Sequence, residues 1–463
     1  MPIRIPDRTK YHLITFGCQM NKSDSERIAG VLEKIGYRAT NKLSLVDLIV
    51  INMCSVRQSA VDRVFSKIGD LAKLKIKNAK CKIILTGCIL KKDYHKLKNK
   101  VDLIFNIRDL PKLPSLLKLA KSKNEFANYL SLSPLHASIS SAYVPIMTGC
   151  NNFCAYCVVP YTRGREISRP AEEIINEIKY LVKKGYKEII LLGQNVNSYK
   201  GTIKNQKSPP TQTEKIKNKK SKNLKIEKSI DFADLLRLID NLPGDFRLTF
   251  ITSHPKDLSD KLIKTMSSGK KIMPYLHLPV QSGDNEILKK MNRGYTVENY
   301  KKIIRRIRKK IPGLSLSTDV IVGFPGETKK QFENTAKLMK QIEFDMVYIA
   351  RYSPRLGTAA ANFADNVSQK EKKSREKILT EILVKTALKK NRKYLKKTVE
   401  VLIEKNPREN KSNAGRIKNE FCLGKTKTFK TVRIKSSSLS LNQITKVKIV
   451  KIGPWGLEGI ISR

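Results

Sequence analysis

The chain has 463 residues, of which 40% are hydrophobic and 29% are charged, so it is long enough for several buried cores. Its 92 Lys and Arg residues against 41 Asp and Glu give a net charge of +51, which favours a polyanionic partner such as nucleic acid. No apolar run reaches about 18 residues, and the N-terminus MPIRIPDRTKYH is charged, which argues against a membrane span and a signal peptide and predicts a cytoplasmic protein.

From about Lys10 to Leu119, apolar runs rich in β-branched residues alternate with amphipathic helical patterns. The runs are YHLITFG, VDLIVIN, CKIILTG and VDLIFNI. The first helix is predicted to open at Ser23, because Glu26 follows it three residues later, as in a capping box. This rhythm is typical of βαβ units, so we predict an α/β region with an open parallel sheet.

Three cysteines each follow one of these apolar runs: Cys18 in TFGCQMN, Cys54 in INMCSVR and Cys88 in LTGCILK. Structural disulfides are rare in the cytoplasm, so these residues are metal ligands, redox groups or small buried side chains. The carboxyl ends of parallel strands lie along one edge of a sheet, where the three can converge. Independent burial would explain one such cysteine, but the same position for all three favours a shared site.

A second alternation runs from Ala142 to about Arg351 and contains six strand candidates, most of them followed by an amphipathic helix. The candidates are AYVPIM, KEIILLG, FRLTFIT, PYLHLPV, LSLSTDVIVG and DMVYIARY. Six repeats are too few for a complete eight-stranded barrel, so we predict an open, partial (βα)6 barrel with its active site at the strand carboxyl ends. The basic run KKIIRRIRKK in this region has two possible explanations, a solvated helix face and contact with RNA.

A polar, lysine-rich segment without aromatic residues interrupts this alternation from Gly201 to Lys228. Its composition favours a disordered surface insertion between a strand and the next helix, and a folded RNA-binding element is the alternative.

A long charged helix is predicted from about Ser368 to Lys396. The segments after it are TVEVLIEK, AGRIKNEFCLG, TFKTVRIKSS and ITKVKIVKIGPWGLEGII, which are β-branched runs broken by Gly, Pro and Asn. This pattern is typical of a small antiparallel β-barrel, and its positive charge suits nucleic-acid contact. Cys422 in this region and Cys81 at the start of an earlier strand are expected to be buried bystanders.

The stretch GCNNFCAYCVVPYTRG, from Gly149 to Gly164, places three cysteines in the spacing CxxxCxxC. A structural zinc site is normally closed by four ligands, and a two-cluster ferredoxin has a longer cysteine run. Three thiolates on one short loop can instead hold three irons of a 4Fe-4S cube and leave the fourth iron open. A zinc site completed by a distant residue such as His136 or His254 is the alternative.

This loop after the first strand of a partial barrel resembles the radical S-adenosylmethionine superfamily. The resemblance implies that Cys150, Cys154 and Cys157 hold the cluster and that its open iron chelates the methionine moiety of S-adenosylmethionine. Tyr156 matches the position of an aromatic residue near the adenine. Gln194 and Asn195 occupy the place of contacts to the methionine group, although GQNVN departs from the usual glycine-rich form.

Within that superfamily, the upstream trio and the C-terminal barrel make the chain similar to the methylthiotransferases. The similarity implies a second 4Fe-4S cluster on Cys18, Cys54 and Cys88. It also implies an N-terminal methylthiotransferase domain at 9–125, a radical core at 136–391 with the 201–228 insertion, and a TRAM RNA-binding domain at 394–463. The tetrapeptide CQMN, with TSHP and HLPVQSGDNEILKKMNRGYT, resembles the bacterial tRNA type that acts on N(6)-dimethylallyladenosine.

The resemblance implies transfer of a methylthio group to carbon 2 of that adenosine, next to the tRNA anticodon, with two S-adenosylmethionine per product. Carbon 2 carries an unactivated C–H bond, so the cofactors must supply the difficult step. The expected partners are tRNA and a reducing electron donor such as flavodoxin or ferredoxin, and the protein is expected to be a monomer. Two alternatives stay open: a methylthiotransferase acting on a protein, and an RNA-binding iron-sulfur protein without transferase activity.

Overall fold

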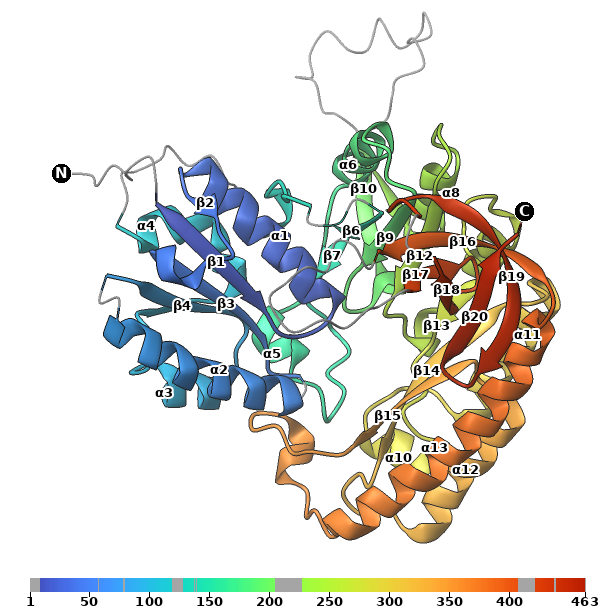
Figure 1. Cartoon of the computed structure of the whole chain (residues 1–463). Helices are drawn as coiled ribbons and strands as arrows, with labels where there is room; N and C mark the ends of the chain where they lie inside the picture. Colours follow the sequence, from blue (N-terminus) through green and yellow to red (C-terminus); the bar gives the residue numbers. More distant parts are fainter. Residues whose placement is uncertain are drawn as a thin grey trace, which may run out of the picture.

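The computed structural model describes residues 9–56, 58–77, 80–118, 128–136, 138, 140–204, 227–406, 421–436 and 439–462. It contains an N-terminal parallel sheet, a central pair of parallel sheets and a C-terminal closed β-barrel (Figure 1). These are the three parts of the predicted fold class, which the structure confirms, except that one strand pair of the barrel is parallel rather than antiparallel. Among the described helices, none combines the length and apolar character needed to cross a bilayer.

The N-terminal sheet has the order β2-β1-β3-β4-β5 and all of its strands are parallel. Its strands are β1 (Lys10–Thr15), β2 (Arg38–Ala39), β3 (Leu48–Cys54), β4 (Lys82–Cys88) and β5 (Leu103–Ile104). Alternate residues of β3 pack into two different hydrophobic clusters, one containing α1 (Gln19–Lys34) and the other α2 (Gln58–Lys77). Because helices cover both faces, every residue of β3 is buried.

Helix α1 begins earlier than the sequence pattern predicts. Its N-cap is Cys18 rather than Ser23, and the Asn21 Oδ1 atom accepts a hydrogen bond from the Cys18 backbone N–H at 3.3 Å. Ser23 instead lies inside the helix, where its Oγ accepts from Arg27 Nη1 at 2.9 Å. The capping box is formed by Cys18 at the N-cap and Asn21 three residues later, so the prediction of a start at Ser23 is wrong.

The central region contains all six predicted strands as two three-stranded parallel sheets, β12-β9-β6 and β13-β14-β15. Their bounds are Ser141–Pro145 (β6), Glu188–Leu192 (β9), Arg247–Ile251 (β12), Tyr275–His277 (β13), Ser315–Val322 (β14) and Met346–Arg351 (β15). A parallel bridge between Leu248 and Ile272 connects the two sheets. The predicted open (βα)6 barrel is therefore present.

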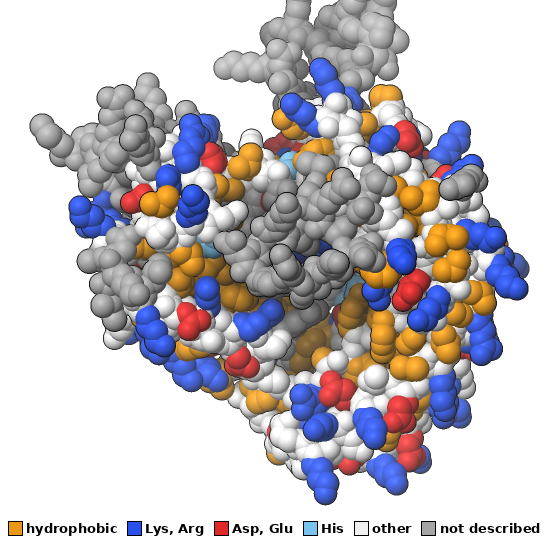
Figure 2. Space-filling view, viewed as in Figure 1, with side chains coloured by type: hydrophobic (Ala, Val, Ile, Leu, Met, Phe, Trp, Pro, Cys, Tyr) orange, Lys and Arg blue, Asp and Glu red, His pale blue; other side chains and the backbone are white. Residues whose placement is uncertain are grey.

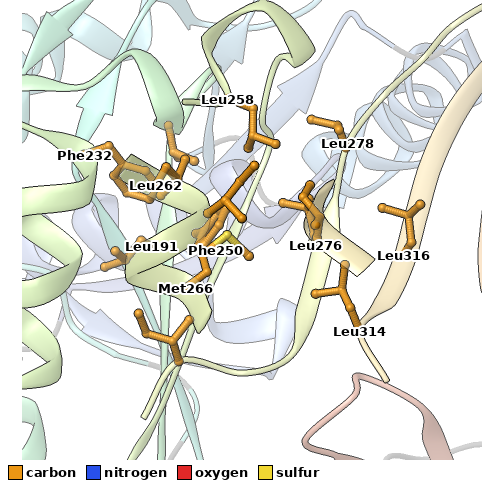
Figure 3. Packing of buried hydrophobic residues seen from close by; sticks show 14 of the residues in the cluster. Leu191, Phe232, Phe250, Leu258, Leu262, Met266, Leu276, Leu278, Leu314 and Leu316 are labelled. Carbon is orange, nitrogen blue, oxygen red and sulfur yellow. The ribbon is translucent and has the colours of Figure 1, made fainter. Parts of the chain in front are cut away.

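Amphipathic helices follow most of these strands and bury their apolar faces against them. They are α6 (Ala171–Lys183), α8 (Phe232–Asp240), α9 (Asp260–Ser268), α10 (Asn285–Lys290), α11 (Val297–Lys310) and α12 (Lys329–Ile342). Figure 3 shows Phe250 of β12 packed with Phe232 and Met266 from the neighbouring helices. This packing leaves the strand carboxyl ends available for chemistry.

The predicted insertion begins and ends as ordered structure. Strands β10 (Lys200–Lys204) and β11 (Glu227–Asp231) pair antiparallel, and the Asp231 side chain then caps α8. Ile230 is buried in the central hydrophobic cluster, which explains why the stem is fixed. The prediction of disorder from Gly201 to Lys228 is therefore wrong at both ends, and 205–226 lie outside the described residues.

Helix α13 (Gln369–Asn391) leads into the barrel, whose strand order is β16-β17-β18-β20-β19. The strands are β16 (Thr398–Lys405), β17 (Phe421–Thr426), β18 (Thr431–Lys435), β19 (Ile444–Gly453) and β20 (Gly456–Ile461). Residues 407–420, which include most of the predicted run AGRIKNEFCLG, lie outside the described part. Cys422 is buried in the barrel and Cys81 in the N-terminal domain, as predicted for bystanders.

The barrel is attached to the central region by specific contacts. Phe429 stacks on Tyr275 with ring centroids 4.3 Å apart, and Lys430 Nζ lies 2.9 Å from Asp345 Oδ1. Both members of this ion pair are buried, and Arg247 Nη1 donates to the Lys425 carbonyl at 3.1 Å. These contacts determine where the barrel lies relative to the strand ends.

Candidate active site

The upstream cysteines lie together at the carboxyl edge of the N-terminal sheet. Cys54 ends β3 and Cys88 ends β4, and the two are register partners. The Cys18 turn is held at the same edge because Asn21 Nδ2 donates to Asn52 Oδ1 and to the Met53 carbonyl, both at 3.1 Å. The convergence predicted from the strand ends is present.

Glycines before two of these cysteines make this close approach possible. Gly17 has φ +148°, and a Cβ there would lie 2.8 Å from the Cβ of Cys54. Gly87 has φ +112°, and a Cβ there would lie 2.2 Å from the Met53 carbonyl oxygen. Any larger residue would push the cysteine turns apart.

Burial raises the pKa of the Cys88 thiol to about 12, the Arg163 guanidinium lowers it, and Cys54 raises it. Cys54 and Cys88 are each 3% exposed. Thiols in such a place become thiolates when a metal binds them, because the cation replaces the proton. The donor set therefore fits a metal cluster.

Arg163 links this trio to the segment that follows the CxxxCxxC loop. Its Nε donates to Cys88 Sγ at 3.0 Å, and its Nη2 donates to Asp24 Oδ2 at 2.5 Å. Asp24 on α1 also accepts a hydrogen bond from the Tyr129 hydroxyl. Arg163 is 2% exposed and Asp24 is fully buried, so this ion pair lies inside the protein.

The second trio lies on the loop between β7 (Met147–Thr148) and α5 (Val159–Arg163). Backbone hydrogen bonds hold the loop: Cys150 N donates to the Gly164 carbonyl at 3.2 Å, and Cys157 N donates to the Cys154 carbonyl at 2.9 Å. Burial, followed by the Cys154 charge, raises the pKa of the Cys157 thiol to about 12. These thiols, like those of the first trio, fit a metal that displaces their protons.

Arg293 anchors this loop and was not singled out from the sequence. Its Nη1 donates to Cys154 Sγ at 3.2 Å and to the Tyr156 hydroxyl at 3.4 Å. Its Nη2 donates to the Pro279 carbonyl at 3.0 Å, and the side chain is 5% exposed. A buried guanidinium that spans two hydrogen-bonding groups holds both in a fixed geometry. The signal for it was the arginine in MNRGYT, a stretch that supports the family resemblance but to which no site role was assigned.

Neither trio is arranged for a single ion. Among the described residues, no three His, Cys, Asp or Glu side chains come close enough to hold one metal ion. Thiolates on a four-iron cube bind different irons and therefore lie further apart than ligands of one ion. His136 pairs instead with Glu26 at 3.2 Å, so the zinc alternative gains no support from it.

Unpartnered polar atoms gather at the ends of β9 and β12. Gln194 Oε1, Asn195 Oδ1, Ser253 Oγ and His254 Nε2 are buried without a hydrogen-bond partner among the described residues. Burial, with Arg293 and Lys256 nearby, lowers the pKa of His254 to about 2, so its ring is neutral. Because buried polar atoms are normally paired, this group fits a polar cofactor. Gln194 and Asn195 are the two residues predicted to contact S-adenosylmethionine.

A cavity of about 670 Å³ lies between the two cysteine regions. Tyr156 and Cys157 line it from the loop, and Val56 and Gln58 line it from the segment after Cys54. Most of the remaining wall comes from β14, β15, α13 and the barrel residue Trp455. The volume is in the range of sites for cofactors and drug-sized ligands, and all three parts of the chain contribute to the walls.

Two family models match the chain: the radical SAM superfamily over residues 144–339 and the uncharacterized protein family UPF0004 over 10–106. A tRNA-2-methylthio-N(6)-dimethylallyladenosine synthase from Clostridium botulinum strain Hall is 40% identical over 97% of this chain and 96% of its own length. Another from Thermoanaerobacter sp. strain X514 is 40% identical over 97% of this chain and 92% of its own. The chain belongs to this synthase family.

Solved structures support the fold of this family member. A radical S-adenosylmethionine methyltransferase from Kitasatospora setae, solved with cobalamin and a [4Fe-4S] cluster, superposes with a TM-score of 0.50 at 11% identity. The match covers 76% of this chain and 77% of that chain. At this identity the likeness concerns the fold alone.

Proposed function

We propose that the chain is a transferase that adds a methylthio group to carbon 2 of N(6)-dimethylallyladenosine in tRNA, next to the anticodon. The observation that carries this proposal is the pair of cysteine trios beside one cavity in a chain 40% identical, over nearly its full length, to synthases of that name. The protein would use two S-adenosylmethionine per product. Since its substrate is tRNA, we assign it to the cytoplasm.

We assign the cluster ligands as the sequence predicted them. Cys150, Cys154 and Cys157 would hold the radical cluster, and Cys18, Cys54 and Cys88 would hold the second one. When bound, the clusters and S-adenosylmethionine supply the radical and the methylthio sulfur. Arg293 holds the Cys154 thiolate and the Tyr156 ring in one geometry, because it donates to both.

The strand ends would bind the cofactor. Gln194, Asn195 and Ser253 offer unpaired oxygens to the ammonium and hydroxyl groups of S-adenosylmethionine, and the neutral His254 offers an Nε2–H donor because its Nδ1 accepts from Lys256 N. Tyr156 lines the cavity between the two cysteine regions and would contact the adenine. The chain's part in catalysis is thus to position cofactor and base.

The C-terminal barrel would bind RNA through its basic side chains, and the reacting base would leave the unpaired anticodon loop to enter the cavity. An external reductant such as flavodoxin or ferredoxin would supply the electron. We propose that the protein acts as a monomer.

Mass spectrometry of tRNA nucleosides tests this function. Cells lacking the protein should accumulate N(6)-dimethylallyladenosine without its 2-methylthio derivative, and the anaerobically reconstituted protein should restore the derivative in their bulk tRNA. Ribosomal proteins from the same cells serve as the second substrate in the assay. A methylthio mass on a ribosomal peptide with unchanged tRNA would replace our proposal with the protein-modifying alternative.

A further inference from the structure

The turn between β19 and β20 brings Trp455 to the cavity that Tyr156 and Cys157 also line. Trp455 is the single tryptophan of the chain, and 54% of its surface is exposed. The core of the barrel is formed instead by residues such as Val447, Ile449 and Leu457, which are almost fully buried. The indole of Trp455 is therefore displayed on the surface and contributes little to barrel packing.

The turn that carries Trp455 is held in place. Gly453 and Gly456 pair across it, and Asn391 Nδ2 at the end of α13 donates to the Gly453 carbonyl at 2.8 Å. Asn391 is 1% exposed, so this anchor lies inside the protein. Because the stack of Phe429 on Tyr275 also fixes the barrel on the core, Trp455 has a defined position over the cavity.

The residues that line the cavity differ in exposure. Its wall at the cysteine loop, Tyr156 and Cys157, is half-buried, whereas Trp455 and Tyr348 of β15 are 54% and 50% exposed. The reacting carbon must lie near the loop, since the radical arises there. The exposed rings of Trp455 and Tyr348 are then left for a group beside the reacting nucleotide.

Charge on β19 indicates what that group is. Lys446, Lys448 and Lys451 project outward from β19, the strand that leads into Trp455. Lysine and arginine side chains outnumber acidic ones over the face seen in Figure 2, in line with the net charge of +51. Proteins bind unpaired nucleotides by combining exposed aromatic rings, which stack on the bases, with a basic surface that contacts the phosphates.

We propose that Trp455 stacks on an unpaired base of the anticodon loop adjacent to the reacting adenosine and thereby positions that adenosine in the cavity. The inference rests on the proposed function. Stacking on an indole needs only the flat face of a base, so Trp455 would supply affinity and position with little sequence preference. Its loss should weaken RNA binding by about five- to a hundredfold.

The test uses the reconstituted full chain and an anticodon stem-loop RNA that carries N(6)-dimethylallyladenosine. Dissociation constants for the parent, Trp455→Ala, Trp455→Phe and Tyr180→Ala are measured with labelled RNA at one salt concentration. Tyr180 is a matched control because it is 58% exposed on α6 and does not line the cavity. We expect Trp455→Ala to bind about five- to a hundredfold more weakly, Trp455→Phe to stay within about threefold, and Tyr180→Ala to match the parent.

The single tryptophan also gives a direct readout. Emission from Trp455 in the parent should be quenched as the RNA saturates, and a ribosomal-protein peptide should leave it unchanged. Unchanged RNA affinity in Trp455→Ala, or parent emission insensitive to bound RNA, would overturn the inference. So would quenching by the peptide instead of the RNA.

The Trp455→Phe variant distinguishes a role in stacking on RNA from a role in packing the barrel. If Trp455→Phe lost affinity as far as Trp455→Ala and both melted at lower temperature with less iron, the residue would be structural and the inference wrong. Failure of the proposed function gives a different result. In that case the parent protein would bind the RNA but form no 2-methylthio nucleoside. Failure of the inference would appear as unchanged RNA affinity in Trp455→Ala, while the parent protein is active.

Discussion

Single residues determine how the two cysteine trios differ. Cys54 and Cys88 end buried strands, whereas Cys150, Cys154 and Cys157 lie on one loop whose shape depends on backbone hydrogen bonds and on Arg293. The geometry of a trio on strand ends is fixed by the whole sheet, while the geometry of a trio on a loop is fixed by the few contacts that anchor that loop. The two sites should therefore respond independently to substitution.

Replacing the trios separately should separate two reactions. With Cys150, Cys154 and Cys157 changed to Ala, the reconstituted protein should keep about half of an expected total of about eight irons and lose cleavage of S-adenosylmethionine. With Cys18, Cys54 and Cys88 changed to Ala, cleavage to 5′-deoxyadenosine should persist without any methylthiolated tRNA. Iron analysis and chromatography of the nucleoside products measure both results.

The matched control replaces Cys81 and Cys422, which are buried away from both trios, and it should retain all iron. Loss of all iron in either trio variant would contradict two independent sites. Parental product formation without the upstream trio would show those cysteines to be bystanders.

Arg293 offers a second test at the residue scale. Arg293→Lys keeps the charge but loses the fork that joins Cys154 Sγ, Tyr156 and the Pro279 carbonyl. A donor to a thiolate stabilises the reduced cluster, so its loss should lower the reduction potential by roughly 30–100 mV and slow cleavage of S-adenosylmethionine. A spectroscopic redox titration checks the potential. Arg306→Lys, at an exposed pair with Asp260, should not move it.

At the scale of elements, the periodic segments were predictable and the helix and insertion boundaries were not. All six central strands and the β-rich C-terminus follow from apolar runs between turn residues. The last run, from Ile444 to Ile461, folds as two strands around Pro454 and Trp455, so its turn residues mark a hairpin. The β10–β11 stem was missed because its polar sequence is stabilised by pairing and by the burial of Ile230.

The outer face of β19 carries a prediction about this barrel. Changing Lys446, Lys448 and Lys451 to Gln should weaken tRNA binding and lower the slope of log affinity against log salt by about one to three, depending on how many phosphates they contact. Binding titrations at several salt concentrations measure the slope. The control changes three exposed lysines of α12, Lys330, Lys337 and Lys340, and should leave the slope unchanged. An equal loss in both variants would mean that net charge, rather than the barrel face, attracts the RNA.

The whole molecule depends on contacts between parts far apart in the sequence. Arg163 contacts Asp24 and Cys88 in the N-terminal region, and Arg355 Nη2 donates to the Val56 carbonyl at 3.2 Å. In Figure 1 the orange segment after β15 reaches toward α2, where this second contact lies. Such contacts hold the two cysteine regions at a set separation across the cavity.

Breaking the buried ion pair between Arg163 and Asp24 should uncouple the reactions at the two cysteine trios. Asp24→Asn leaves the Arg163 charge buried with a weaker partner and should cost about 3–5 kcal/mol of stability, as for other buried pairs. The product yield per 5′-deoxyadenosine should fall, because cleavage needs only the radical site. Quantifying both nucleosides in one reaction gives this ratio. Glu173→Gln, which removes a partly exposed partner of Arg169, is the control. An unchanged ratio in Asp24→Asn would show that the pair does not set the geometry between the sites.

The sequence by itself determined the fold class, the six cysteines worth naming and the family resemblance. These rest on local signals: apolar periodicity, the CxxxCxxC spacing and a cysteine after each of three strands. Only the tertiary structure showed Arg163 on Cys88, Arg293 on Cys154, the orphaned polar atoms at Ser253 and His254, and Trp455 over the cavity. The physical reason is that hydrogen bonding and burial depend on which segments meet in space. Arg293 lies 139 residues from Cys154 along the chain, and no local pattern encodes that meeting.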